Sequence, residues 1–138
     1  MIIMEAIFIT KRLETLLPAI REFVETELIP LESEHTTRPF KETEKILSQK
    51  RVLVKQKGWW NLHLPTHEGG MGVTLCEFGQ VSEILSLSPY YGQYTFNAQP
   101  PDIGNTEMIS RFASDEIKST YLQPLLEGKI RSCFSMTE

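Results

Sequence analysis

The 138-residue sequence predicts an all-α protein, a compact bundle of about six helices that ends in a short C-terminal strand. Apolar residues recur at helical spacing near the start of the chain. Capping residues, glycines and prolines then mark the ends of several further helical segments. Beyond a helix stop at Gly128, the apolar and aromatic residues that begin at Ile130 favour a strand.

The first helix is expected over residues 11–28, with Thr10 as its candidate N-cap. Its apolar residues fall on one face: Leu13, Leu16, Leu17, Ile20, Phe23, Val24 and Leu28. Pro18 lies inside this pattern and predicts either a kink or a helix that starts near Leu17. Pro30 is expected to end the helix.

A second helix is expected over residues 41–57. Lys55 and Lys57 in its last turn suit the negative end of the helix dipole, and Gly58 provides a C-cap. Residues 59–65 then form a short extended crossing, whose two tryptophans are expected to anchor the core.

The third helix has a clear start signal, because Thr74 and Glu77 have the spacing of a capping box. Residues 90–96 are rich in aromatic side chains and are expected to begin a fourth helix. A fifth helix should follow Gly104, with three apolar residues facing inward: Met108, Ile109 and Phe112.

Ser114 is expected to cap the sixth helix. Pro124 is expected to separate that helix from a turn at residues 125–126. The chain contains no internal repeat and no linker, so residues 1–138 are expected to form a single domain.

The composition is that of an ordinary globular protein, with 41% hydrophobic and 23% charged residues. A net charge of -4 argues against nucleic acids and strongly anionic membranes as partners, because both need a basic face. No apolar run is long enough to span a membrane, and the first ten residues do not resemble a secretory signal. Two distant cysteines indicate two buried or reduced thiols in place of a disulfide framework, and this favours an intracellular protein, with cytoplasmic, mitochondrial and peroxisomal locations left open.

No metal site and no catalytic residue are expected in this chain. His63 and His67 have i, i+4 spacing, but Pro65 prevents a helix that would aim both at one ion. Residues 69–72 are rich in glycine and precede a capped helix, yet they lack the P-loop lysine and favour a tight turn over a phosphate site. Glutamate pairs two residues apart point away from each other on a helix, so they are expected to be surface charges.

Several segments, taken in order, resemble the N-terminal helical domain of the acyl-CoA dehydrogenase family. They cover most of residues 11–138: GWWNLHLP at 58–65, EGGMG at 68–72, NAQPPDIGN at 97–105, YLQPLLEG at 121–128 and CFSMTE at 133–138. The resemblance implies a helical bundle over residues 11–128, preceded by an extension of unknown role at residues 1–10. Residues 129–138 would be the first strand of a middle β-domain that we expect to follow.

The resemblance also implies that the terminal strand contributes to a flavin site. In the family, residues at the positions of Phe134, Ser135, Met136 and Thr137 lie beside the flavin ring of FAD. The Thr137 position hydrogen-bonds the flavin, and an aromatic residue at the Phe134 position covers it. Phenylalanine replaces the more usual tyrosine here, which is compatible with stacking because stacking needs only the ring face.

The aromatic region contains the candidate substrate-binding residues. By the same resemblance, Gly92, Gln93 and Phe96 lie nearest the fatty-acyl chain. An ordinary core is an equally good interpretation, because an acyl pocket and a core are both apolar and differ mainly in whether a void remains.

The family resemblance implies a flavoprotein oxidoreductase of fatty acid metabolism that α,β-dehydrogenates an acyl-CoA thioester with FAD. Its glutamate base lies in the C-terminal helical domain, which this chain does not contain. Glu138 corresponds to a strand-end glutamate and not to that base. We therefore expect the chain alone to bind FAD weakly or not at all and to be nearly inactive.

The alternative is a stand-alone helical binding or interaction module without redox activity. Composition does not separate it from the first hypothesis. The unpaired edge of the terminal strand further predicts either disorder after about Gly128 or self-association through that strand.

Overall fold

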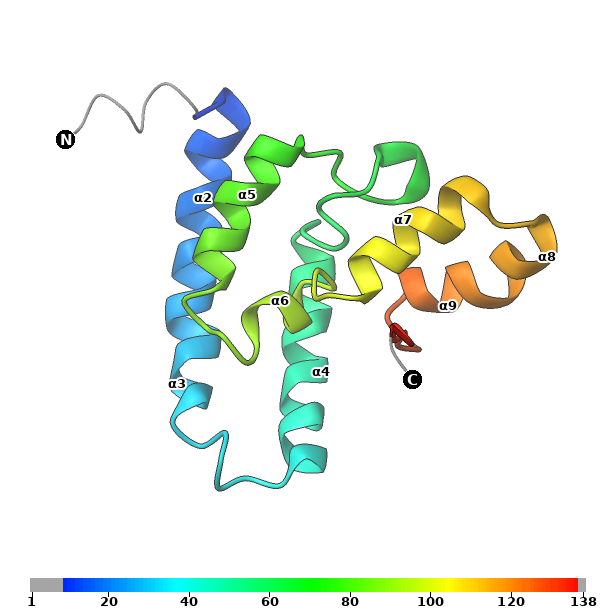
Figure 1. The fold of residues 1–138 in the computed structure, drawn as a ribbon. Helices are drawn as coiled ribbons and strands as arrows, with labels where there is room; N and C mark the ends of the chain where they lie inside the picture. The colour runs from blue at the N-terminus through cyan, green and yellow to red at the C-terminus, as the bar shows by residue number, and fades with distance from the viewer. Residues whose placement is uncertain (1–8, 137–138) are drawn as a thin grey trace. The chain divides into compact units, whose positions relative to one another are not determined.

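The computed structural model describes residues 9–136, apart from the side chain of Phe40 (Figure 1). Every regular element in this part of the chain is helical, so the predicted all-α fold of about six helices is confirmed. The chain divides between Phe96 and Asn97 into two compact units. That residues 1–138 fold as a single domain stays a prediction.

The first unit opens with one long continuous helix. It consists of α2 (Lys11–Phe23), a π-helical turn η1 (Val24–Leu28) and α3 (Ile29–Glu32). Thr10 caps α2, as predicted, by accepting a hydrogen bond from the Leu13 amide. The helix therefore starts at Lys11, and Pro18 lies inside it. The buried face consists of six of the predicted apolar residues: Leu13, Leu16, Ile20, Phe23, Val24 and Leu28.

The prediction that Pro30 ends this helix is wrong. The helix passes through Pro30 because the π turn η1 precedes it, with the Ile29 amide bonded to the carbonyl of Val24. A proline ring in a regular α-helix would collide with the carbonyl four residues back, and a wider turn relieves that collision. The same arrangement recurs in the second unit, where a π turn precedes Pro124.

The helix α4 (Phe40–Gln56) matches the predicted second helix closely, and Gly58 follows it with a φ of 73°. The chain then crosses the unit in a loop that contains the 3₁₀ turn η2 (Thr66–Glu68). Trp59 is buried, as expected for a core anchor, whereas Trp60 is half-buried beneath the cations of Arg51 and Lys55.

The helix α5 (Leu75–Leu85) begins with the predicted capping box and packs side by side with α2 (Figure 1). The expected fourth helix is reduced to α6 (Gly92–Thr95), which packs against α4. Three aromatic rings form the centre of this unit. Phe96 stacks on Trp59 with ring centroids 6.2 Å apart, and the edge of Phe23 meets both rings.

The second unit contains α7 (Asp102–Phe112), α8 (Asp115–Ile117), a π turn η3 (Lys118–Leu122) and α9 (Gln123–Leu126). Within it, α7 packs against η3 and α9. Ser114 caps α8 as predicted. The proposed break at Pro124 is wrong, because the helix continues to Leu126 after the π turn.

The predicted inward face of α7 is also wrong. Met108 is 53% exposed and Phe112 is 82% exposed. The residues that α7 buries are instead polar: Asp102, Asn105 and Thr106. The helix starts at Asp102, so the predicted start after Gly104 was at least three residues late.

The predicted C-terminal strand is not formed within the part of the chain that the structure describes. Residues 131–136 have no regular secondary structure. A strand is held by hydrogen bonds to a neighbouring strand, and the described residues provide only helices, turns and loops. Thr137 and Glu138 lie outside the described residues, and self-association through this segment stays a prediction.

Candidate functional site

The segment that carries the predicted flavin contacts is exposed. Phe134 is 58% exposed and Met136 is 83% exposed, and Ser135 is exposed as well. Residues 133–136 make no hydrogen bond to any other residue that the structure describes. Their amides and carbonyls, together with the face of the Phe134 ring, are therefore available to a ligand. Thr137, the fourth predicted contact, lies outside the described residues.

This chemistry fits a flavin. A flat heteroaromatic ring needs an aromatic or apolar face on one side and hydrogen-bond donors and acceptors at its edge. Phe134 offers the first and the unpaired backbone groups of residues 133–136 offer the second. The contact itself stays a prediction.

A buried carboxylate holds the start of this segment within the second unit. Asp102 Oδ1 accepts hydrogen bonds from the Ser132 amide at 2.6 Å and from the Ser132 hydroxyl at 2.5 Å. Asp102 Oδ2 accepts one from the Gln99 side-chain amide at 2.5 Å and lies 3.9 Å from the Arg131 guanidinium. Sequence reasoning missed Asp102, although an aspartate after two prolines at a helix start is a recognisable signal.

The predicted acyl-chain residues lie together on and beside α6. A Cβ atom at Gly92 would lie 1.9 Å from the carbonyl oxygen of Leu85, so this glycine permits close packing of the backbone. Phe96 is fully buried in the aromatic centre of its unit. Both residues thus have packing roles, whether or not they also contact a ligand.

Two polar atoms near α6 have no hydrogen-bond partner in the described structure. They are the buried Gln93 Oε1 and the buried Thr95 Oγ1. Native proteins leave few buried polar atoms unsatisfied, so each such atom calls for an explanation. Gln93 was predicted as a substrate contact, while Thr95 was missed because a threonine in an aromatic stretch gives no distinctive sequence signal.

The histidines are not gathered into a site. No group of three or more His, Cys, Asp or Glu side chains suited to a metal occurs among the described residues. His35 stacks on Tyr90 and lies 2.9 Å from the Tyr91 hydroxyl. His67 is exposed beside Glu68.

His63 packs beside the Phe78 ring, and both of its ring nitrogens are buried without a partner. Burial lowers the pKa of His63 from 6.5 to about 4, and the nearby charge of Glu68 opposes that shift. His63 is therefore neutral near pH 7.

The glycine-rich residues form the tight turn that was predicted. Gly69 and Gly72 have φ values of 83° and 66°, in the left-handed region that favours glycine. Gly70 lies so close to the carbonyl of Leu64 that a Cβ atom would be 2.2 Å from the oxygen.

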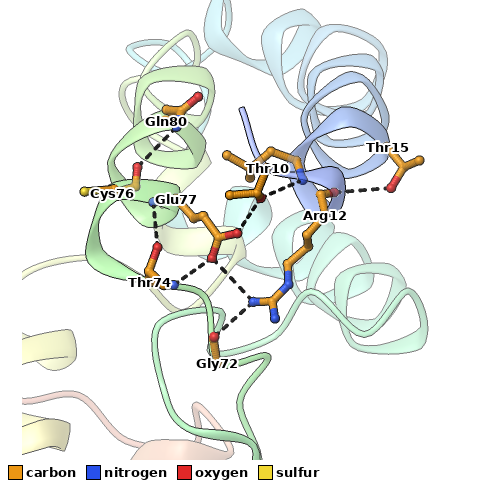
Figure 2. A network of polar contacts seen from close by, with 9 residues as sticks. Thr10, Arg12, Thr15, Gly72, Thr74, Cys76, Glu77 and Gln80 are labelled. Carbon is orange, nitrogen blue, oxygen red and sulfur yellow. Dashed lines mark hydrogen bonds and ion pairs between the residues drawn. The ribbon is translucent and has the colours of Figure 1, made fainter. Parts of the chain in front are cut away.

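A polar cluster around the buried carboxylate of Glu77 joins the starts of α2 and α5 (Figure 2). Glu77 accepts hydrogen bonds from the Thr10 hydroxyl at 2.6 Å and from the Thr74 amide at 2.8 Å. Arg12 lies 3.5 Å from the same carboxylate and donates to the carbonyl of Gly72 at 2.9 Å. The hydrogen bond from Thr10, followed by that from Thr74, lowers the pKa of Glu77 against the opposing effect of burial. The Thr10 and Arg12 contacts join α2 to the start of α5, and the Thr74 contact caps α5 itself, so the cluster has a structural role.

The described chain contains no helix that is both long and apolar enough to cross a membrane.

Comparison with known proteins identifies the relatives of this chain. The family described as "Acyl-CoA dehydrogenase, N-terminal domain" matches residues 10–129. Acyl-CoA dehydrogenase family member 10 of Mus musculus is 36% identical over 141 residues, which cover 91% of this chain and 13% of that protein. The Mycobacterium tuberculosis protein named as acyl-CoA dehydrogenase FadE2 is 34% identical over 106 residues, which cover 77% of this chain and 24% of that protein.

A solved structure agrees with these matches. It is assigned to an acyl-CoA dehydrogenase of Mycobacterium abscessus and superposes with a TM-score of 0.80 at 34% identity. The match covers 94% of this chain and 35% of the solved one, so the chain spans only a part of the length of its relatives. On the family match and these identities, the chain belongs to the acyl-CoA dehydrogenase family and carries its N-terminal domain.

Proposed function

We propose that this chain acts as the N-terminal part of a flavin-dependent enzyme that α,β-dehydrogenates acyl-CoA thioesters. The match of residues 10–129 to the N-terminal domain of that family is the observation that carries the proposal. FAD is the proposed cofactor, and an acyl-CoA is the proposed substrate. Fatty acid metabolism is the proposed setting.

In this proposal the chain binds and orients, and the flavin, when bound, supplies the redox step. Phe134 covers one face of the flavin ring. The free backbone groups of residues 133–136, together with Thr137, hold its edge. The exposure of Phe134 and the unused hydrogen-bonding groups beside it support this role.

The acyl chain is proposed to lie near α6. Gln93 is the best-supported contact of the three candidates, because its buried oxygen lacks a partner in the described structure. Gly92 and Phe96 would shape the floor through their packing. The base that removes the α-proton is proposed to belong to a part of the enzyme outside residues 1–138.

A stand-alone helical module is not favoured, since each of the named relatives is a much longer dehydrogenase-type protein. The two proposals are separated by expressing the chain alone and within the complete reading frame that contains it. The longer protein should show flavin absorbance and acyl-CoA-dependent dye reduction, and the chain alone should show no dye reduction. Dye reduction by the chain alone, or its absence from both, would contradict the proposal, as would a reading frame that ends at Glu138.

A further inference from the structure

We propose that Asp102 is a positioning residue that fixes the chain at Ser132 and thereby sets the place of the flavin-facing residues 134–136. The inference rests on the proposed function for the role of those residues. The attachment of Ser132 to Asp102, called the tie below, consists of two hydrogen bonds within one compact unit.

The geometry makes Asp102 an anchor. This residue is only 3% exposed, and a buried carboxylate is costly unless its oxygens are hydrogen-bonded. Three donors meet this need: the Ser132 amide, the Ser132 hydroxyl and the Gln99 side chain. Arg131 adds a cation at 3.9 Å. The backbone is thus fixed at Ser132 by a charge-assisted pair of bonds to one oxygen.

The anchored position is significant because the flavin-facing residues come directly after it. Ser132 is two residues before Phe134, and residues 133–136 have no hydrogen bond of their own in the described structure. Over so short a span, the last fixed point limits where the exposed ring of Phe134 can lie. Helix α7, which begins at Asp102, is the element that carries this fixed point.

A charge at the start of α7 could instead serve only that helix. A carboxylate in the first turn stabilises the positive end of the helix dipole wherever it points. That role explains neither the burial of Asp102 nor the two bonds to a residue 30 positions away. The two roles differ in what they do to residues 132–136.

The first test measures the tie in the 138-residue chain. Amide hydrogen exchange, followed by NMR, should show protection at Ser132 that Asp102→Ala lowers by about tenfold, because the amide loses its acceptor. Asp102→Asn keeps the size and one oxygen of the side chain and should have an intermediate effect. If Asp102→Ala does not fold, the Ser132 exchange rate is compared between Asp102→Asn and the unmodified chain. Asp115→Ala is the matched control, since Asp115 is an exposed acid in the first turn of α8 in the same unit.

The second test measures the consequence for the cofactor. Titrating FAD into the flavin-free form of the complete protein that contains this chain should give a bound flavin, whose absorbance measures the affinity. Asp102→Ala should weaken that binding roughly threefold to tenfold, as expected for the loss of one or two anchoring hydrogen bonds. Asp115→Ala should leave it unchanged.

The outcomes separate this inference from the proposed function. Unchanged Ser132 exchange in Asp102→Ala would overturn the tie, whatever FAD does. Lost protection with unchanged FAD affinity would overturn the positioning role. A complete protein that binds no FAD would instead overturn the proposed function, and the positioning role with it.

Discussion

Two buried carboxylates, Glu77 and Asp102, each join segments that are distant in the sequence. Glu77 is bonded to Thr10 across 67 positions, and Asp102 to Ser132 across 30. The capping box at Thr74 and Glu77 could be predicted because both partners lie within one helical turn. The contacts with Thr10 and Arg12 could not, since nothing local in the sequence records which helix start comes to lie beside another.

Glu77→Ala is expected to destabilise the protein by about 1–3 kcal/mol, because it removes a cap and leaves the Thr10 hydroxyl and the Thr74 amide without an acceptor. Urea denaturation monitored by circular dichroism measures this. Glu83→Ala, at an exposed position on the same helix, is the control and should stay within a few tenths of a kcal/mol.

The same contacts predict how the stability depends on pH. The pKa of Glu77 is lower in the folded state than its ordinary value near 4.5, so the folded state favours the ionised form. The stabilisation of the folded state by ionised Glu77 is complete above the pKa of this residue in the unfolded chain. It is lost as the pH falls through the lowered pKa of Glu77 in the folded state. The stability difference between the unmodified chain and Glu77→Gln should therefore shrink below about pH 4.5. A difference that stays constant down to pH 2 would refute this account of Glu77.

His63 predicts a second, separate pH effect. The folded state keeps it neutral down to a pKa of about 4, whereas the unfolded chain takes up the proton near 6.5. The unfolded state thus gains stability as the pH falls below 6.5, and folding should weaken by about 2 kcal/mol between pH 8 and pH 5. His63→Phe should remove this loss, while His67→Gln, at an exposed position, should retain it. Urea denaturation at pH 8 and pH 5 measures the free energy of unfolding of the unmodified chain and of both variants. An equal loss of stability in all three proteins would exclude His63 as the cause.

At the scale of the element, most helices could be predicted from caps and apolar periodicity. The ends at Thr10, Gly58, Thr74 and Ser114 agree with the sequence because each depends on neighbouring residues. Caps and apolar periodicity give no signal for a π turn, and two predictions failed for that reason. Pro30 and Pro124 were expected to stop helices that instead pass through them after π turns.

The face of α7 shows the same limit. Apolar periodicity pointed to Met108 and Phe112 as core residues, whereas the helix buries Asp102, Asn105 and Thr106. Asp102 has hydrogen-bond partners in Ser132 and Gln99, whereas Asn105 Oδ1 is buried without a partner in the described structure. Those partners could not be inferred from the sequence of the helix alone.

The glycines of two elements predict opposite effects of the same substitution. Gly92→Ala should destabilise the protein by about 1–3 kcal/mol, because its Cβ atom would meet the Leu85 backbone, which cannot move alone. Gly79→Ala should stabilise it by about 0.5–1 kcal/mol, since Gly79 lies on the exposed side of α5 with open space around it. Thermal unfolding of the two variants is a direct comparison. Equal shifts would contradict the close packing at Gly92.

At the scale of the whole molecule, several short motifs that follow one another in the family's order predicted the family correctly. The match over residues 10–129 confirms that prediction. Less of the candidate site could be predicted from the sequence. The flavin-facing residues were named from the resemblance alone, while the anchor at Asp102 and the orphan oxygens of Gln93 and Thr95 emerged only from the structure.

The most direct test of the central claim is the visible spectrum of the flavin in the complete protein that contains this chain. Adding an acyl-CoA under anaerobic conditions should bleach the main flavin band, and Phe134→Ala should alter the spectrum before any substrate is added. The 138-residue chain, mixed with FAD and acyl-CoA, should show no bleaching. A complete protein that binds no flavin, or whose flavin band is unchanged by acyl-CoAs of every chain length tested, would contradict the account.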